Sequence, residues 1–202
     1  ALSVEYGQRH RRELASARAL ARWYRVERHT VVHLPLGALL RSSLTDRRRA
    51  LPLARPGRKA IPSTYVPARN TLLLALALGV AESSGAQEIY LGVNAVDYSG
   101  YPDCRPEFLR AFSRLAAVAT RDAVERGRAV RVRAPLLRLS KAEIVRRGDR
   151  LGVPWELTWS CYRGGARPCG RCDSCVLRAR GFAAAGRVDP ALSRARPSGP
   201  NR

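Results

Sequence analysis

The sequence predicts an α/β fold in which a parallel sheet carries helices on both faces. Three observations lead to this prediction. Short apolar or β-branched segments alternate with helical patterns along the chain. Apolar residues make up 46% of the 202 residues, enough for a sizeable core. The longest apolar run, residues 71–81, is about half of what a bilayer crossing requires, so no membrane span is expected.

The first half of the chain contains two expected strands and two expected helices. Residues 1–6 and 29–36 are apolar or β-branched and predict strands. Between them, residues 8–24 place apolar side chains on one helical face and arginines on the others. Residues 40–63 are polar and contain several prolines, which predicts a long loop. Residues 70–81 are apolar on every side, so a helix buried all round is expected.

The second half continues the alternation. Its expected elements are a strand at 88–93, a long amphipathic helix at 107–126, a strand within 129–139, a helix from Ser140, a closing helix at 176–186 and a tail at 194–202. Glu143 lies where it completes a capping box with Ser140. Ligands of parallel sheets bind at the carboxyl ends of the strands, so the segments that follow each strand are the candidate site.

The net charge of +21 arises from 37 Lys+Arg against 16 Asp+Glu, and Lys59 and Lys141 are the only lysines. Such a field favours anionic partners, including nucleotides and RNA. The arginines are spread along the chain, however, and a compositional bias toward arginine gives the same count. We favour that explanation, so nucleic acid is not an expected partner. No signal peptide opens these residues, and a cytoplasmic location is expected.

Four cysteines predict a metal site. Cys161, Cys169, Cys172 and Cys175 have the spacing C-x7-C-x2-C-x2-C. Four thiolates complete a tetrahedral shell with no open position, which indicates a structural zinc ion. An iron–sulfur cluster and metal-free reduced cysteines are the alternatives. Cys104 stands apart without a nearby base, so we expect it to be a packed thiol.

A second candidate site follows the expected strand at 88–93, in the segment NAVDYSGYPDCR. Carboxylates, hydroxyls and aromatic rings there suit a planar heterocycle, which rings can stack on and carboxylates can hydrogen-bond. The same residue types also make ordinary turns. Both interpretations stay open at this point.

Weaker signals lie elsewhere. Arg69 and Asn70 are placed at a helix start, where backbone N–H groups favour an anion, although Asn70 also suits a helix N-cap. His10 follows the first strand and is either a solvated helix-start residue or a ligand. Lys141 follows the last strand and is placed to meet a phosphate.

Together these motifs resemble one family. The matching segments are VEYGQRH (4–10), STYVPARN (63–70), LGVNAVDYSGYPDCR (91–105), LSKAEIV (139–145) and SCYRGGARPCGRCDSCVLRARGF (160–182). They resemble the 7-cyano-7-deazaguanine synthase (QueC) family of queuosine biosynthesis. The resemblance implies a Rossmann-like, adenine nucleotide α-hydrolase-like domain with a C-terminal zinc loop. It also implies ATP-dependent conversion of 7-carboxy-7-deazaguanine and ammonia to the nitrile, with Mg²⁺ beside the ATP phosphates.

The resemblance also implies a division of roles. A nucleotide- and substrate-binding domain would span residues 1–155, a zinc-binding segment 156–190 and a tail 191–202, and the protein would be a homodimer. The residues implied to contact substrate are Asp97, Tyr98 and Asp103 for the base, Gly100 and Pro102 for the shape of their loop, Arg69 and Asn70 for the nucleotide or carboxylate, and Tyr6 and Gln8 for the border of the crevice. Lys141 is the remaining candidate for the nucleotide.

One departure from the family pattern affects activity. Family members carry a first strand and an SGGxDS loop that cradles the ATP phosphates, and these residues contain neither. We therefore expect a truncated chain that is unstable or inactive by itself. Two other functions stay open, a related pyrophosphatase-loop ligase that acts on tRNA and a basic zinc protein that binds RNA.

Overall fold

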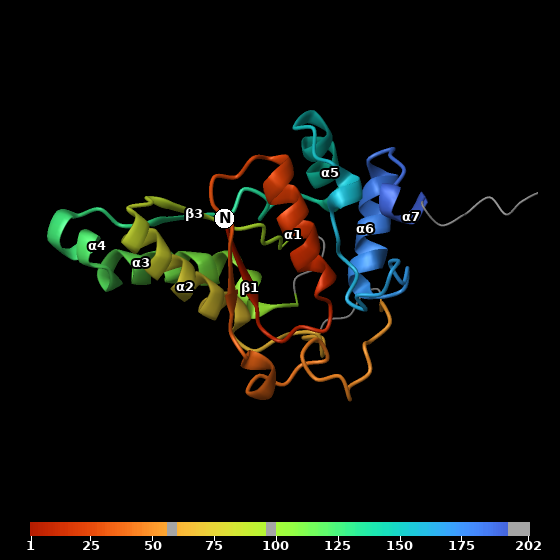
Figure 1. Ribbon diagram of the computed structural model, residues 1–202, viewed down its shortest axis with the longest axis horizontal. Coiled ribbons are helices and arrows are strands. Elements are labelled where there is room, and N and C mark those ends of the chain that lie inside the picture. Colours follow the sequence, from red (N-terminus) through yellow and green to blue (C-terminus); the bar gives the residue numbers. More distant parts are fainter. Residues whose placement is uncertain (56–59, 96–99, 194–202) are drawn as a thin grey trace, which may run out of the picture. The chain divides into compact units, whose positions relative to one another are not determined.

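The computed structural model describes residues 1–55, 60–95 and 100–193, and these form two compact units. The first unit combines Ala1–Arg58, Ser63–Val66 and Lys141–Arg202. The second combines Lys59–Pro62 and Pro67–Ser140. Residues from the two ends of the chain therefore share a unit, while the middle of the chain forms the other (Figure 1).

The first unit begins with a parallel strand–helix–strand arrangement. Strand β1 (Leu2–Glu5) pairs with β2 (Thr30–His33), with Val4 opposite Val32. Helix α1 (Arg12–Trp23) connects them and buries Leu14. The unit's remaining elements are η1 (Leu36–Ala38), α5 (Lys141–Arg150), η3 (Trp155–Leu157), α6 (Asp173–Ala184) and α7 (Pro190–Ser193).

Helices α5 and α6 of the first unit pack closely because glycines face larger neighbours. A Cβ at Gly181 of α6 would lie 2.6 Å from the Cβ of Lys141 in α5.

The first unit also contains a buried ion pair between α6 and the residue before α7. Arg178 contacts Asp189 at 2.7 Å, and both side chains are shielded from water. The Arg178 Nη1 also donates to the hydroxyl of Thr158. Such a pair is costly to break because either partner left alone is a buried charge.

The second unit also contains a parallel pair. Strand β3 (Glu88–Tyr90) pairs with β4 (Arg131–Arg133), and Ile89 lies opposite Val132. The helical elements are α2 (Arg69–Ser84), η2 (Pro102–Cys104), α3 (Pro106–Ala119) and α4 (Arg121–Arg126). A core of apolar side chains joins α2, α3 and the strands, and it contains Leu74, Leu78, Ile89, Leu109, Phe112 and Ala116.

An exposed ion cluster covers the β3–β4 pair. The Tyr90 hydroxyl donates to Glu88, and Arg131 and Arg133 contact the same carboxylate at 3.1 and 2.9 Å. The hydrogen bond from Tyr90 and then that from Arg133 lower the pKa of Glu88 below its usual value. The cluster therefore favours the ionised carboxylate.

The expected α/β class, with parallel strands flanked by helices, is confirmed. Among the described residues the strands lie as two parallel pairs, one in each unit. The division into a nucleotide- and substrate-binding domain, a zinc-binding segment and a tail, with boundaries at residues 155 and 190, stays a prediction. Within the described part of the chain, no helix combines the length and apolar character that a membrane crossing needs.

Two expectations about helices were wrong. The single helix expected over 107–126 is two helices, because Thr120 adopts an extended backbone (φ −118°, ψ 147°) between α3 and α4. Helix α2 is not buried all round. Its buried residues, Asn70, Leu74, Leu78 and Ala81, lie on one face, whereas Leu72 and Val80 are exposed. The apolar sequence of α2 therefore exceeds what the core of its own unit covers.

Candidate functional site

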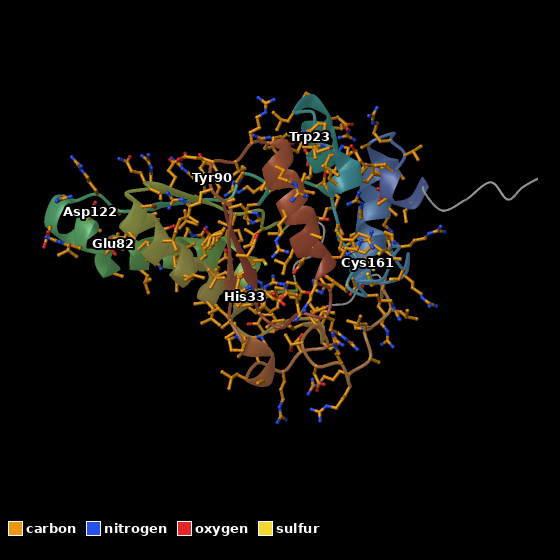
Figure 2. The ribbon with its side chains drawn as sticks, viewed as in Figure 1. Trp23, His33, Glu82, Tyr90, Asp122 and Cys161 are labelled. Carbon is orange, nitrogen blue, oxygen red and sulfur yellow. The ribbon has the colours of Figure 1, made fainter. Side chains whose placement is uncertain are left out.

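The four predicted cysteines lie together in the first unit. Cys172 precedes α6 and Cys175 lies in its first turn, while Cys161 and Cys169 come from the preceding loop. Figure 2 labels Cys161 beside α6. Their sulfur atoms all lie within 4.8 Å of one another, and Cys169 and Cys175 are 4.0 Å apart. In a tetrahedral zinc site with Zn–S bonds of about 2.3 Å, the sulfurs are roughly 3.8 Å apart. The cluster therefore has close to the dimensions of a metal site.

The surroundings of the cluster favour thiolate. Cys161 Sγ accepts backbone N–H groups of Arg163 at 3.4 Å and Cys169 at 3.3 Å. Hydrogen bonds from the Cys172 and Cys175 thiols, and then these N–H groups, strongly lower the pKa of Cys161. Hydrogen bonds to the Cys161 and then the Cys172 sulfur raise the pKa of Cys175. A dication would supply the positive charge that four thiolates need.

These residues fit a metal ion. Cys161, Cys172 and Cys175 are buried, and all five cysteines of the chain, which lie within the described residues, are free of disulfides. A closed set of four sulfur ligands is consistent with a structural zinc ion.

The carboxyl end of β1 leads into a buried polar segment. Tyr6 packs with Leu44 and Val66. Gln8 is buried, and its Oε1 accepts the backbone N–H of Tyr6 at 2.7 Å. Its Nε2 donates to Glu13 Oε1 at 3.0 Å. Gln8 is therefore held by Glu13 of the first turn of α1, and Gln8 in turn holds the backbone of Tyr6. The prediction that these two residues border a crevice stays a prediction.

Arg9 ties a long loop to this segment. Its guanidinium donates to the carbonyls of Ser43, Arg47 and Arg49 at 3.1, 2.7 and 2.7 Å. Its backbone N–H donates to the carbonyl of Leu44 at 2.9 Å. The described part of the expected loop at 40–63 is therefore ordered around the end of β1.

The loop that carries Cys161 and Cys169 packs directly on the same segment. The rings of Tyr162 and His10 lie 5.9 Å apart. Gly164 has φ +65°, and a Cβ there would lie 2.9 Å from the Cα of His10. Only glycine permits this approach. The cysteine loop and the Tyr6–His10 segment thus form one site within the first unit.

The predicted residues of the second unit form a separate buried network. Asn70 donates its backbone N–H to Asp103 Oδ2 at 2.9 Å, and its Nδ2 to the Asp103 carbonyl at 3.0 Å and the Cys104 sulfur at 3.1 Å. Arg69 donates to Asn70 Oδ1 at 3.2 Å. The network joins the start of α2 to η2.

This network corrects one expectation and confirms another. Asn70 lies inside the first turn of α2, and the N-cap position belongs to Ala68, so the N-cap hypothesis for Asn70 was wrong. Asp103 accepts the backbone N–H of Asn70 in the first turn of α2, which has no acceptor within the helix. Cys104 is buried and packed, as expected.

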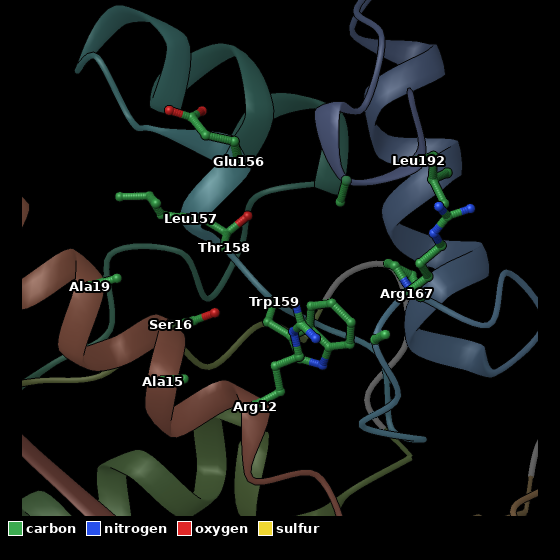
Figure 3. Close-up of a pocket in the computed structure, with 13 residues that line it drawn as sticks. Arg12, Ala15, Ser16, Ala19, Glu156, Leu157, Thr158, Trp159, Arg167 and Leu192 are labelled. Carbon is green, nitrogen blue, oxygen red and sulfur yellow. The ribbon is translucent and has the colours of Figure 1, made fainter. Parts of the chain in front are cut away.

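A cavity of about 320 Å³ lies in the first unit beside the cysteine loop (Figure 3). One wall is the face of α1 that carries Arg12, Ser16 and Ala19. The Arg12 guanidinium lies over the Trp159 ring at 4.7 Å, and Trp159 Nε1 donates to the Cys161 carbonyl. The cysteine loop is therefore held from this side as well.

Comparison with known proteins identifies the family. The family profile described as "Queuosine biosynthesis protein QueC" matches residues 1–186. The chain belongs to this family. A relative named 7-cyano-7-deazaguanine synthase from Anaeromyxobacter sp. (strain Fw109-5) is 61% identical over 197 residues, which cover 95% of this chain and 83% of the relative. Proteins of the same name from Stutzerimonas stutzeri (strain A1501) and Xanthomonas oryzae pv. oryzae (strain PXO99A) are 55% and 57% identical, each covering 94% of this chain and 84% of the relative.

The remaining residues predicted to contact substrate or nucleotide are Asp97, Tyr98, Gly100, Pro102 and Lys141. Asp97 and Tyr98 lie outside the described residues. Gly100 is half-buried, Pro102 begins η2, and Lys141 begins α5 and packs against Gly181.

Some residues of the site were missed by sequence reasoning. The sequence around Arg9 did not indicate that its side chain holds the loop, because its partners are backbone carbonyls more than thirty residues away. His10 was predicted to be either a solvated helix-start residue or a ligand. The solvated interpretation was wrong, because the side chain is buried against the cysteine loop. The spacing of His10 and Glu13 at i and i+3 of an expected helix was a readable signal for their contact.

Proposed function

We propose that this chain converts 7-carboxy-7-deazaguanine, ammonia and ATP to 7-cyano-7-deazaguanine. The observation that carries the proposal is 61% identity, over 95% of the chain, to a relative named 7-cyano-7-deazaguanine synthase. A carboxylate is a poor electrophile, so adenylation first turns its oxygen into a leaving group. Ammonia then gives an amide, and a second adenylation allows loss of that oxygen to form the nitrile. Mg²⁺ would stabilise the leaving pyrophosphate.

The substrate contacts are part of the proposal. Asp97, Tyr98 and Asp103 would recognise the deazaguanine, with Gly100 and Pro102 shaping their loop. Asp103 is buried, and its Oδ2 accepts the Asn70 N–H, which fixes the carboxylate in place. The other proposed contacts are Arg69 and Asn70 for the nucleotide or carboxylate, Tyr6 and Gln8 at the crevice border, and Lys141 for the nucleotide.

The metal would have a structural role. We assign zinc to the cysteine cluster, because four sulfur ligands complete a tetrahedral shell and leave no position for a substrate or water. The proposal also includes a homodimer, the functional division at residues 155 and 190, and a cytoplasmic location, where ATP is available and thiols stay reduced.

Two measurements test the substrate class. Isothermal titration calorimetry of the purified protein with 7-carboxy-7-deazaguanine should give saturable binding, and guanosine should compete poorly. Mass spectrometry should detect the nitrile only when ATP and ammonium are both present, and only when these residues are joined to the first strand and SGGxDS loop that family members carry. Absence of both binding and product would overturn the proposal, and binding of RNA in place of the deazaguanine would support the basic zinc protein instead.

A further inference from the structure

One buried polar atom of the site has no partner. Among the described residues, His10 Nδ1 is the buried side-chain nitrogen or oxygen for which no hydrogen bond is found. The side chain of His10 is 5% exposed. Unpaired buried polar atoms are rare in native proteins, and each requires an explanation.

The other ring nitrogen of His10 is firmly held. Nε2 lies 3.0 Å from Glu13 Oε2, and Glu13 Oε1 accepts from Gln8 Nε2 at 3.0 Å. An ionised carboxylate only accepts hydrogen bonds, so Nε2 carries the proton and Nδ1 keeps its lone pair. In the catalytic triads of hydrolases a carboxylate holds the Nδ1–H of a histidine, and the free Nε2 acts as the base. In His10 the carboxylate holds Nε2, so Nδ1 would be the base.

His10 also has the surroundings of a catalytic base. It follows β1, and ligands of parallel sheets bind beyond the carboxyl ends of the strands. The Tyr162 ring packs against the His10 ring, and Gly164 packs against the His10 Cα and Cβ, which keeps the side chain buried. The side chain of Glu13 is 37% exposed, so the carboxylate that holds Nε2 reaches the surface. Nδ1 is not one of the atoms grouped around the metal site.

We propose that His10 is the general base of amide formation and that Glu13 is its positioning residue. The inference rests on the proposed function. The nitrogen lone pair of ammonia forms the C–N bond to the adenylated carbonyl, and the C–O bond to AMP breaks with its electron pair leaving on the phosphate oxygen. The nitrogen passes one proton to Nδ1. Glu13 stabilises the imidazolium that results.

The first test separates adenylation from nitrogen transfer. The variants are made in a protein that joins these residues to the first strand and SGGxDS loop of the family. There His10→Gln should retain pyrophosphate release that depends on 7-carboxy-7-deazaguanine, and should form amide from ammonium about 100-fold more slowly or worse. Hydroxylamine is a stronger nucleophile than ammonia and a much weaker base, so its adduct loses a proton to water readily, and hydroxamate should form at close to the wild-type rate. His33→Gln is the matched control, because His33 also contacts a carboxylate, Glu5, yet is exposed.

Each outcome decides something. Unchanged amide formation in His10→Gln would show that His10 has no role as a base. Loss of hydroxamate formation together with amide formation would show the same, because a base should be dispensable for hydroxylamine. If the wild type with the SGGxDS loop releases no pyrophosphate, the proposed function is contradicted instead, and a spectroscopic measurement then decides on His10. In ¹⁵N NMR spectra Nδ1 should be the unprotonated nitrogen, and Glu13→Gln should mix the two tautomers. A protonated Nδ1 in the wild type overturns the inference.

Discussion

Replacing Gly164 by alanine should destabilise the protein through two separable effects. The backbone at Gly164 has φ +65°, a conformation that costs a residue with a Cβ about 1–2 kcal/mol. The new Cβ would also lie 2.9 Å from the Cα and 3.2 Å from the Cβ of His10. The backbone of His10 cannot move aside as a flexible side chain can. The overpacking therefore lowers the free energy of unfolding by about a further 1–3 kcal/mol. The expected loss is roughly 2–5 kcal/mol.

Gly170 provides the matched control within the same loop. Its φ is +70°, but nothing lies within 4 Å of a Cβ placed there. Gly170→Ala should therefore cost only the backbone term, about 1–2 kcal/mol. Thermal unfolding of zinc-saturated protein measures both, since 1 kcal/mol lowers the Tm of a chain of this size by about 2–4 °C. Equal losses in the two variants would refute the close packing of the cysteine loop on His10.

Three further predictions concern the metal, the buried ion pair and an exposed carboxylate. Cys172→Ser should lower the zinc content measured by mass spectrometry and remove the stabilisation that added zinc gives, whereas Cys104→Ser should leave the metal content unchanged. Asp189→Asn leaves a buried arginine without its counter-charge and should cost about 3–5 kcal/mol in denaturant unfolding; a loss below about 1 kcal/mol would contradict a buried pair. Glu88 has a lowered pKa in the fold, so its stabilisation is present above its usual pKa of 4.5 and is lost as the pH falls through the lowered value. Glu88→Gln should therefore be less stable than wild type at neutral pH and equal to it in strong acid, and a difference that persists in acid would instead reflect the hydrogen bond from Tyr90.

The metal site was predictable because its determinants are local. All four cysteines lie within fifteen residues, and the start of α6 places Cys172 and Cys175 one helical turn apart. The alternation of strands and helices was predictable for the same reason, since each period is set by a few neighbouring residues. The break at Thr120 was not, because amphipathic spacing continues across it and only the extended backbone shows that the helix ends.

The role of Asn70 needed a contact between distant residues. Its sequence context allows an N-cap, but Asp103 lies 33 residues away and occupies the position of the acceptor. The capping function therefore comes from outside the helix. A sequence pattern reports which groups need partners, and the fold decides which residue supplies them.

His10 shows the same limit, and it connects the metal to the proposed chemistry. The contact with Glu13 is local, but the burial of the ring depends on Tyr162 and Gly164, more than 150 positions further along the chain. Those residues lie between Cys161 and Cys169, within the loop that a metal ion would close. Metal binding stabilises the loop because the free energy of binding is partly folding free energy. A structural metal at these cysteines would thus affect the proposed catalysis by keeping Tyr162 and Gly164 packed against His10, without contacting any reacting atom.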